Sequence, residues 1–391
     1  MIRWKARALC VFNTDSYIRI SYHYVIGLPL RFSSPIVVNP YELKWFDVEL
    51  PDPGPYEVVF RNRACLICGS DLHLYKGLHP FAPLPACCGH EVAADVIEVG
   101  SSVSTIRKGD RVYVSGTGAT PVPCGNCQQC VRGESSKCEN RETSISFTVD
   151  GKSVSRFPSG YGEYSMGHEA NAYKLPENVS YSEAAVATDL GYVIGVVKRS
   201  GLGIGLTAAI LGAGPIGLRT LEVARLAGAS KIIVSEPVDY RLDCAESLGA
   251  DVVVGSSGSD PVDDVLAATK GKGVDYVFDT TGNLRATQQG LKMLKTGMGG
   301  MGTLILMGLY EDPVLSINLS EYMYKAGKIV AEWGIKEDRP RSVVEALNLM
   351  ADKKVNIMKW ITHQLSEAKA VEAMEMLIRK DEKAIGVEIV H

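Results

Sequence analysis

The sequence predicts an α/β protein built from a β-rich domain followed by a doubly wound parallel sheet. Its 391 residues exceed what one hydrophobic core usually spans, so we expect two domains. Short strand-like segments rich in Val, Gly and Pro occupy residues 51–185, as in a compact β-rich fold. From about 191 to 335 strand-like and helical segments alternate, which indicates a parallel sheet covered by helices.

The composition excludes several classes of partner. Hydrophobic residues make up 46% of the chain and charged residues 22%, as in ordinary globular proteins. The 41 Lys and Arg residues against 45 Asp and Glu residues give a net charge of −4, which argues against nucleic acid or an anionic membrane. No stretch approaches the roughly 18 apolar residues of a membrane span. The start, "MIRWKARALCVFNTDSY", lacks the apolar core of a secretory signal, so we predict a cytoplasmic protein.

In the first domain, four cysteines crowd into "CGNCQQCVRGESSKC", residues 124–138. In a long chain without an export signal, clustered cysteines more often bind metal or catalyse than form disulfides. Four thiolates complete the tetrahedral shell of Zn²⁺ and leave no position open for substrate, so the run predicts a structural zinc site. An iron–sulfur cluster is the second metal interpretation, and a zinc-ribbon nucleic-acid module is a weaker one because the surroundings are not basic. The predicted ligands are Cys124, Cys127, Cys130 and Cys138.

A second set of metal-binding residue types lies upstream, in "CLICGSDLHLYKG" and "CCGHEVAADVIEVG". Cys68, His90 and Glu91 offer a thiolate, an imidazole and a carboxylate, and three protein ligands leave one position on zinc for substrate. Each also has an ordinary explanation, since buried Cys is common and a lone His usually satisfies a hydrogen bond. The triplet Gly-His-Glu recurs at 167–169. We interpret His168 as a surface residue, because His90 is nearer to Cys68 and enters a cleaner strand pattern.

The second domain opens with a nucleotide-binding pattern, "TAAILGAGPIG", residues 207–217. An apolar strand leads into Gly-x-Gly-x-x-Gly and then a helix, the context in which this motif binds a dinucleotide. Glycine lets the backbone approach the pyrophosphate, which the helix N-terminus favours. Glu236 ends the next strand, where a carboxylate binds the adenosine ribose and repels the extra phosphate of NADP, so NAD is favoured over NADP. Arg241 tempers this preference, because a guanidinium could pair with that phosphate.

The remaining segments continue the alternation. "VDYVFDTTG" (274–282) and "GTLILMGLY" (302–310) are predicted strands whose glycine-bearing ends could lie along the cofactor or form ordinary turns. The tail offers two amphipathic helices and a closing strand, whose Met and Leu spacing predicts core packing. Residues 10–45 and 141–158 fit no clear pattern.

In their order, "CGSDLH", "GHE", the four-cysteine segment and "GAGPIG" resemble the zinc-containing medium-chain dehydrogenase/reductase family, which includes alcohol, sorbitol and threonine dehydrogenases. The resemblance runs from about Val48 to the C-terminus. It implies a GroES-like catalytic domain with the structural zinc lobe at 1–190 and a Rossmann NAD(P)-binding domain at 191–335. Residues 336–391 would complete the catalytic domain, with the active-site cleft between the two. The chain departs from the family pattern in extra residues before "LPDPGPYEV" and in "SISFTVDGKSVSRFPSG".

The resemblance also implies site residues. Cys68 and His90 match the catalytic zinc ligands, and Glu91 matches a carboxylate that ligates or approaches the metal. The remaining ligand varies among members, and "AAVATDLGYVIG" places Asp189 there, as in the secondary-alcohol and polyol branches. Residues that match the dinucleotide site, the last five more loosely, are Gly212, Gly214, Ile216, Gly217, Glu236, Arg241, Met307, Gly308, Leu309, Glu332 and Trp333.

The implied activity is hydride transfer from an alcohol to NAD(P)⁺ in an enzyme holding two zinc ions per chain, one catalytic and one structural. Ser70 matches the hydroxyl that touches the substrate oxygen, and His73 the far end of its proton relay. The substrate would be a small secondary alcohol, polyol or sugar, or else a threonine-type amino alcohol. Two competing interpretations of the function are a zinc-free quinone or enoyl reductase and a non-enzymatic dinucleotide-binding protein. The family suggests a homodimer or homotetramer.

Overall fold

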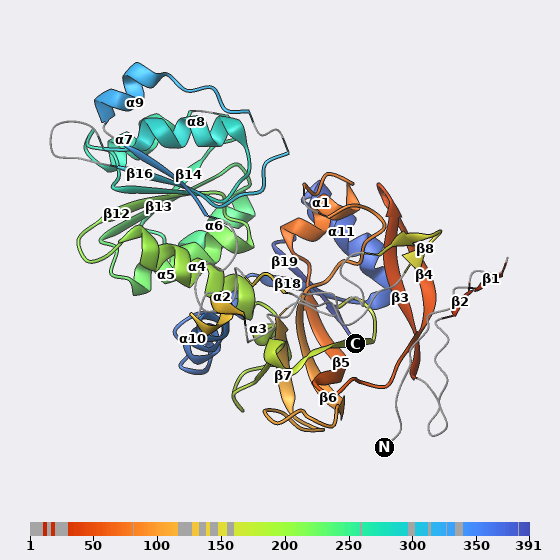
Figure 1. Ribbon diagram of the computed structural model, residues 1–391. Helices are drawn as coiled ribbons and strands as arrows, with labels where there is room; N and C mark the ends of the chain where they lie inside the picture. The colour runs from red at the N-terminus through yellow and green to blue at the C-terminus, as the bar shows by residue number, and fades with distance from the viewer. Residues whose placement is uncertain are drawn as a thin grey trace. The chain divides into compact units, whose positions relative to one another are not determined.

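Two units make up the chain, and the polypeptide passes between them more than once (Figure 1). The first unit comprises residues 1–187, 363–379 and 387–391, and the second comprises 188–362 and 380–386. The computed structural model describes residues 11–13, 17–19, 30–80, 82–115, 127–132, 138–140, 148–154, 160–258, 260–295, 302–311, 314–325, 327–332, 339–381 and 383–391.

In the described part of the first unit, the main sheet has seven strands in the order β11-β7-β6-β5-β19-β18, with β10 also paired to β5. Strands β5 and β6 are antiparallel neighbours, and Cys65 pairs with Val92. The C-terminal end of β5 and the N-terminal end of β6 therefore lie side by side at one end of the strands. The strands are β5 (Glu57–Leu66), β6 (Glu91–Val99), β7 (Arg111–Ser115), β10 (Tyr164–His168), β11 (Ala172–Lys174), β18 (Ile361–Ser366) and β19 (Gly386–Val390).

Short helices connect these strands. The helix α1 follows β5, and its N-cap is Cys68. Helix α3 begins with Ser180, whose hydroxyl accepts from the backbone N–H of Glu183, the usual solution for an exposed helix start. The helices of this unit are α1 (Gly69–Tyr75), α2 (Gln128–Val131), α3 (Tyr181–Ala184) and α11 (Ala370–Arg379), with 3-10 turns at Glu169–Asn171 and Glu367–Lys369.

Residues 10–45 and 141–158, for which the sequence predicts no clear pattern, contain regular strands where the structure describes them. Strands β3 (Leu30–Asn39) and β4 (Glu42–Leu50) form an antiparallel hairpin within the sheet β1-β2-β4-β3, and β8 (Thr148–Val149) pairs with β9 (Lys152–Ser153). The two regions share one core, because Val149 and Val154 pack with Phe32, Ile36 and Val48. The outer strands are β1 (Val11–Asn13) and β2 (Tyr17–Arg19).

The second unit is organised around a parallel sheet, as the sequence predicts. Its described strands run in the order β14-β13-β12-β15-β16-β17, and all their pairs are parallel. The chain moves outward from β12 in one direction and from β15 in the other, so the topological switch point lies between them, where such sheets bind ligands. The strands are β12 (Thr207–Leu211), β13 (Lys231–Glu236), β14 (Val252–Gly255), β15 (Tyr276–Asp279), β16 (Thr303–Leu306) and β17 (Lys328–Ala331).

Helices cover both faces of this sheet. Helices α5 and α8 lie on opposite faces (Figure 1). Apolar side chains of the strands, such as Ala209, Ile233, Val277 and Leu304, form the core on the face that α8 covers, where they pack with Met293 of that helix. The helices are α4 (Ala187–Ser200), α5 (Pro215–Leu226), α6 (Asp239–Ser247), α7 (Pro261–Ala268), α8 (Leu284–Met293), α9 (Leu319–Lys325) and α10 (Arg339–Ala351), with a 3-10 turn at Ile357–Lys359.

The C-terminal segment divides differently from the sequence-based boundary at 336. Helix α10 belongs to the second unit, and the chain re-enters the first unit only at His363. The reason is packing against α4. A Cβ added at Gly191 would lie 2.8 Å from the carbonyl oxygen of Ser342, and Lys198 Nζ lies 2.6 Å from Glu345 Oε2.

Across the described residues, no helix is both long and apolar enough to cross a membrane.

Candidate active site

The three predicted catalytic ligands converge at the end of the sheet where β5 finishes and β6 begins. Cys68 lies between β5 and α1, His90 directly precedes β6, and Glu91 is its first residue. One ligand atom from each lies within 4.8 Å of the others. The Glu91 side chain is fully buried, and that of His90 is 26% exposed. Cys68 is also partly exposed.

This donor set fits one zinc ion. Zinc binds sulfur at about 2.3 Å and nitrogen or oxygen at about 2.0–2.2 Å, so its tetrahedral ligand atoms lie about 3.3–3.8 Å apart. The Nε2 atom of His90 lies 3.9 Å from Glu91 Oε1, close to that spacing. Burying a carboxylate beside a thiol costs free energy unless a cation compensates the charge. Three protein ligands leave a position for a further oxygen.

Asp71 also belongs to this site, although the sequence alone assigns no role to this residue of "CGSDLH". It is fully buried in α1, and its Oδ1 lies 3.4 Å from His90 Nδ1. Its Oδ2 accepts from the backbone N–H of Cys68 at 3.1 Å, and its Oδ1 accepts from the backbone N–H of Gly89 at 3.1 Å. A carboxylate on the far nitrogen of a metal-binding His orients the ring and increases its basicity. The local signal that could have found it is an acidic residue three positions after the N-cap, the spacing of a capping box.

Tyr161 donates a third hydrogen bond to Asp71, from its hydroxyl to Oδ2 at 3.1 Å. The side chain is fully buried, and burial together with the nearby Asp71 raises the pKa of Tyr161 well above its ordinary value. The hydroxyl therefore keeps its proton near neutral pH and can act as a hydrogen-bond donor. Tyr161 lies far from Asp71 in the sequence, and no local pattern points to it.

Ser70 and His73 both lie in α1, three residues apart and therefore on neighbouring positions of one helix face. Both are partly exposed. Their role as a proton path stays a prediction.

Asp189 lies in the first turn of α4, in the second unit. Its Oδ2 is 3.1 Å from Nη1 of Arg219, a residue of α5 that is fully buried. The guanidinium of Arg219 also lies 4.7 Å from the centre of the Trp360 ring. The carboxylate of Asp189 thus has a guanidinium partner, whereas Glu91 has the thiol and the imidazole. Glu91 is the better candidate for the third zinc ligand.

The second Gly-His-Glu triplet has a structural role. His168 is partly exposed, and its ring stacks on Tyr56 with 5.8 Å between centroids. Its Nδ1 accepts from the backbone N–H of Ala170. Glu169 Oε2 accepts from the backbone N–H groups of Ser104 and Thr105. The side chains of His168 and Glu169 therefore both bind backbone N–H groups of nearby loops.

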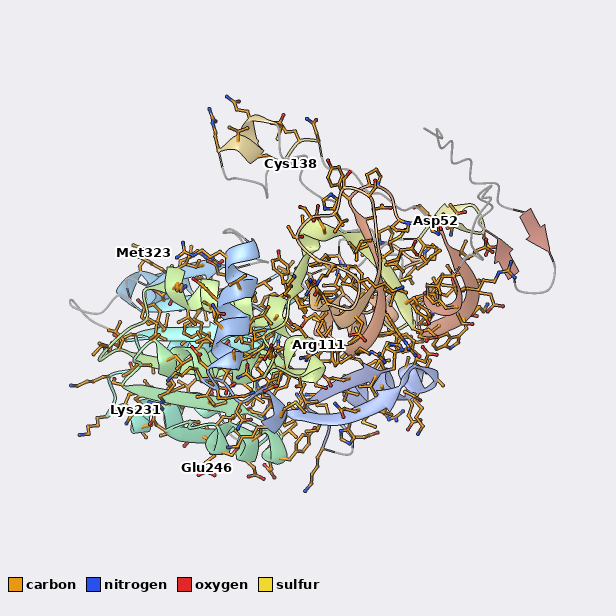
Figure 2. The ribbon with its side chains drawn as sticks, turned by 90° about the horizontal axis from the view of Figure 1, so that it is seen from below. Asp52, Arg111, Cys138, Lys231, Glu246 and Met323 are labelled. Carbon is orange, nitrogen blue, oxygen red and sulfur yellow. The ribbon has the colours of Figure 1, made fainter. Side chains whose placement is uncertain are left out.

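Three of the four clustered cysteines lie together beside α2, and Cys124 is outside the described residues. Cys138 is labelled in Figure 2. The Sγ atom of Cys127 is 3.5 Å from that of Cys130 and 3.8 Å from that of Cys138. Sulfurs bound to one Zn²⁺ in a tetrahedron lie about 3.8 Å apart, whereas a disulfide requires about 2.05 Å. The spacing fits thiolates around one metal ion.

Replacing Cys127 by serine should lower the melting temperature by at least about 5 °C, because metal binding at such a site contributes directly to folding. Calorimetry of the purified variant checks this, together with its zinc content, which should fall by one ion per chain. The kcat of the folded fraction should stay within about twofold, since a closed shell has no position for substrate. Cys244→Ser, at a partly buried cysteine of α6, is the control. Equal melting of both variants would contradict the structural role.

The dinucleotide loop has the geometry that its glycines predict. Gly212 has φ +93, and a Cβ on Gly217 would lie 2.0 Å from Gly212 O, so neither position accepts a side chain. A Cβ on Gly214, by contrast, would meet nothing nearer than Arg241 Nη1 at 3.9 Å. The space over Gly214 at the start of α5 therefore fits a pyrophosphate close to the backbone.

Glu236 is buried at the end of β13 and holds this loop. Its Oε2 accepts from the backbone N–H of Ala213 at 2.8 Å, and its Oε1 accepts from that of Val238 at 3.2 Å. Arg241 donates from Nη2 to the carbonyl of Ala384 at 3.2 Å. The carboxylate and the guanidinium thus both lie at the glycine loop with backbone partners of their own.

The loosely matched positions lie beyond the ends of β16 and β17. Met307, Gly308 and Leu309 follow β16, and a Cβ on Gly308 would lie 2.2 Å from the backbone N of Gly282, so the two loops are in backbone contact. Glu332 is buried, and its Oε2 lies 2.8 Å from Arg199 Nη2. Trp333 lies outside the described residues.

Comparisons with known proteins agree with this arrangement. Residues 54–177 match the model of the alcohol dehydrogenase GroES-like domain, and residues 215–352 match that of the zinc-binding dehydrogenase. L-threonine 3-dehydrogenase of Pyrococcus abyssi is 35% identical over 278 residues, 70% of this chain and 74% of that protein. Sorbitol dehydrogenase of Bacillus subtilis is 28% identical over 365 residues, 93% of this chain and 98% of that protein.

A zinc-binding dehydrogenase of Sinorhizobium meliloti 1021, solved with NADP bound, superposes with a TM-score of 0.76 at 27% identity, covering 93% of this chain and 100% of the other. The matched regions contain the GroES-like sheet with Cys68, His90 and Glu91 and most of the parallel sheet that follows the glycine loop. The chain therefore belongs to the zinc-containing medium-chain dehydrogenase family.

Proposed function

We propose that this chain is a zinc-dependent dehydrogenase that transfers a hydride from a secondary alcohol, polyol or sugar to NAD⁺ or NADP⁺. The observation that carries the proposal is the convergence of Cys68, His90 and Glu91 at one edge of the first unit's sheet. Relatives named as sorbitol dehydrogenases support a polyol substrate. Zinc would act there as a Lewis acid that lowers the pKa of the substrate hydroxyl, and the nicotinamide would accept the hydride.

The residues of this chain would prepare and hold the substrate. Cys68, His90 and Glu91 would hold the metal with one position left for the substrate oxygen. Asp71 keeps the His90 ring in place from its Nδ1 side. Ser70, two residues after Cys68, would accept a hydrogen bond from the substrate hydroxyl and so receive its proton first. His73, on the adjacent position of the same helix face, would pass that proton toward water.

A substrate panel tests the proposal directly. The zinc-loaded enzyme would be assayed with polyols, simple secondary alcohols and sugars, each with NAD⁺ and NADP⁺ in parallel, by the absorbance of the reduced cofactor. We expect turnover of at least one of these classes. Cofactor binding without turnover across the whole panel would contradict the proposal and favour a non-enzymatic dinucleotide-binding protein.

L-threonine belongs in the same panel as the second candidate substrate. It is favoured by the L-threonine 3-dehydrogenase relatives, which are 35% identical to this chain. Threonine carries a secondary hydroxyl, so the same metal chemistry serves it, and the difference lies in the groups that bind the amino acid. Threonine turnover above that of every polyol would identify the amino-alcohol branch.

We further propose that NAD⁺ is the preferred cofactor, because the carboxylate of Glu236 lies at the glycine loop and would repel the extra phosphate of NADP. Glu236→Gln should raise kcat/KM for NADP⁺ relative to NAD⁺ by about tenfold, the effect of relieving about 1.4 kcal/mol of repulsion. Initial rates with both cofactors check this. Glu246→Gln, at an exposed position of α6 labelled in Figure 2, is the control that removes an equal charge elsewhere. An unchanged ratio in Glu236→Gln would refute the role of this carboxylate.

We also propose that the enzyme forms a homodimer or homotetramer. Strand β17 is the edge of the described parallel sheet, and Val330 on it is 36% exposed. On the preceding helix α9, Met323 is 77% exposed (Figure 2). The edge strand of a sheet with exposed apolar side chains is a surface that a second copy can pair with.

A further inference from the structure

Tyr161 connects the two segments that carry the catalytic ligands. One segment is α1 with the N-cap Cys68, where the Tyr161 hydroxyl donates to Asp71 Oδ2 at 3.1 Å. The other is the strand entry at Gly89, where a Cβ would lie only 2.6 Å from the Tyr161 ring at Cδ1. The residue before it, Gly160, donates its backbone N–H to Gly89 O at 2.9 Å. Tyr161 thus contacts the neighbours of both Cys68 and His90.

The hydroxyl of Tyr161 is one of the hydrogen-bond donors that stabilise the buried carboxylate of Asp71. A fully buried carboxylate is stable only when donors compensate its lost hydration. Tyr161 contributes one donor, and the backbone N–H groups of Cys68 and Gly89 contribute two more. Those two backbone groups belong to the ligand segments themselves, so the position of the Asp71 carboxylate determines where Cys68 and the His90 ring lie. A phenylalanine would fill the same space but would leave Oδ2 without this donor.

We propose that Tyr161 is a positioning residue for the catalytic zinc site, acting through Asp71 on Cys68 and His90. The inference rests on the proposed function, because it assumes a zinc ion among Cys68, His90 and Glu91. Outer partners of metal ligands typically change metal affinity or activity by about 10–100-fold when they are removed. Tyr161 is one contact further out, so its effect should fall at or below the lower end of that range.

The test measures the metal rather than turnover. The catalytic zinc is identified as the ion that is missing from Cys68→Ser. In Tyr161→Phe, this ion should transfer to a chromogenic chelator about 3- to 10-fold faster than it does in the wild type. The visible bands of the cobalt-substituted variant should also shift, since they report the ligand geometry. Tyr113→Phe is the matched control, because Tyr113 is equally buried in β7 of the same sheet. If the Tyr161 hydroxyl only stabilised the fold, Tyr161→Phe would behave like Tyr113→Phe. Both variants would then melt at a lower temperature, and their zinc-release rates and cobalt bands would match those of the wild type.

A double-mutant cycle tests the route through Asp71. If Tyr161 acts through that carboxylate, Tyr161→Phe should add nothing to the release rate of Asp71→Asn, so the two effects should not be additive. Additive effects would overturn the route, and wild-type release with superimposable cobalt bands in Tyr161→Phe would overturn the proposal. If Asp71→Asn does not fold, the cobalt bands of Tyr161→Phe decide alone. A wild type that binds no zinc at Cys68 would instead refute the proposed function.

Discussion

Cys68→Ser should lower kcat/KM by at least about 10³-fold and remove one of the two zinc ions that we propose for each chain. A serine hydroxyl stays protonated near neutral pH and binds zinc far more weakly than a thiolate. Losing the Lewis acid removes several kcal/mol of transition-state stabilisation, and about 4 kcal/mol corresponds to three orders of magnitude in rate. Steady-state kinetics and metal analysis of the same preparation check both parts.

Cys87→Ala is the matched control for this variant. Cys87 is a fully buried cysteine of the same unit that packs with Phe32 and Ile36 instead of joining the ligand cluster. It should lower stability by the free energy of a small cavity while keeping two zinc ions and most of the activity. If Cys68→Ser retained both its zinc and its turnover, the assignment of the catalytic site would be wrong.

Asp189→Asn should lower the free energy of unfolding by about 3–5 kcal/mol and leave the zinc content unchanged. The change removes the carboxylate that is paired with the buried guanidinium of Arg219, which is the costly way to break a buried ion pair. Denaturant unfolding and metal analysis together check the prediction. The result also decides which carboxylate completes the catalytic site, because a ligand would take the metal with it.

Glu345→Gln provides the comparison for a partly exposed pair. Glu345 lies 2.6 Å from Lys198 Nζ, and their side chains are 30% and 59% exposed. Such a pair contributes at most about 1 kcal/mol, so this variant should unfold nearly like the wild type. If Asp189→Asn instead unfolded like Glu345→Gln and had lost one zinc ion, Asp189 rather than Glu91 would be the ligand.

Much of the site could be predicted from the sequence because its groups lie in short local motifs. The spacing of Cys127 and Cys130 brings two thiolates into one turn, and Gly-x-Gly-x-x-Gly between strand and helix predicts the loop after β12. Residues 10–45 show no such local pattern, although they include β3 and the start of β4. Their apolar side chains find their partners at Val149 and Val154, more than a hundred positions away, and a local window contains no such information.

Residue type and near spacing were enough to predict the family, the parallel sheet and the groups that can bind metal. Only the folded chain shows which partner each carboxylate has: Glu91 lies beside a thiol and an imidazole, Asp189 lies beside a buried guanidinium, and Asp71 accepts a hydrogen bond from a tyrosine of a distant segment. The physical reason is that a carboxylate has the same chemistry wherever it occurs. Its role depends on the charges and donors that folding places within a few ångströms of it.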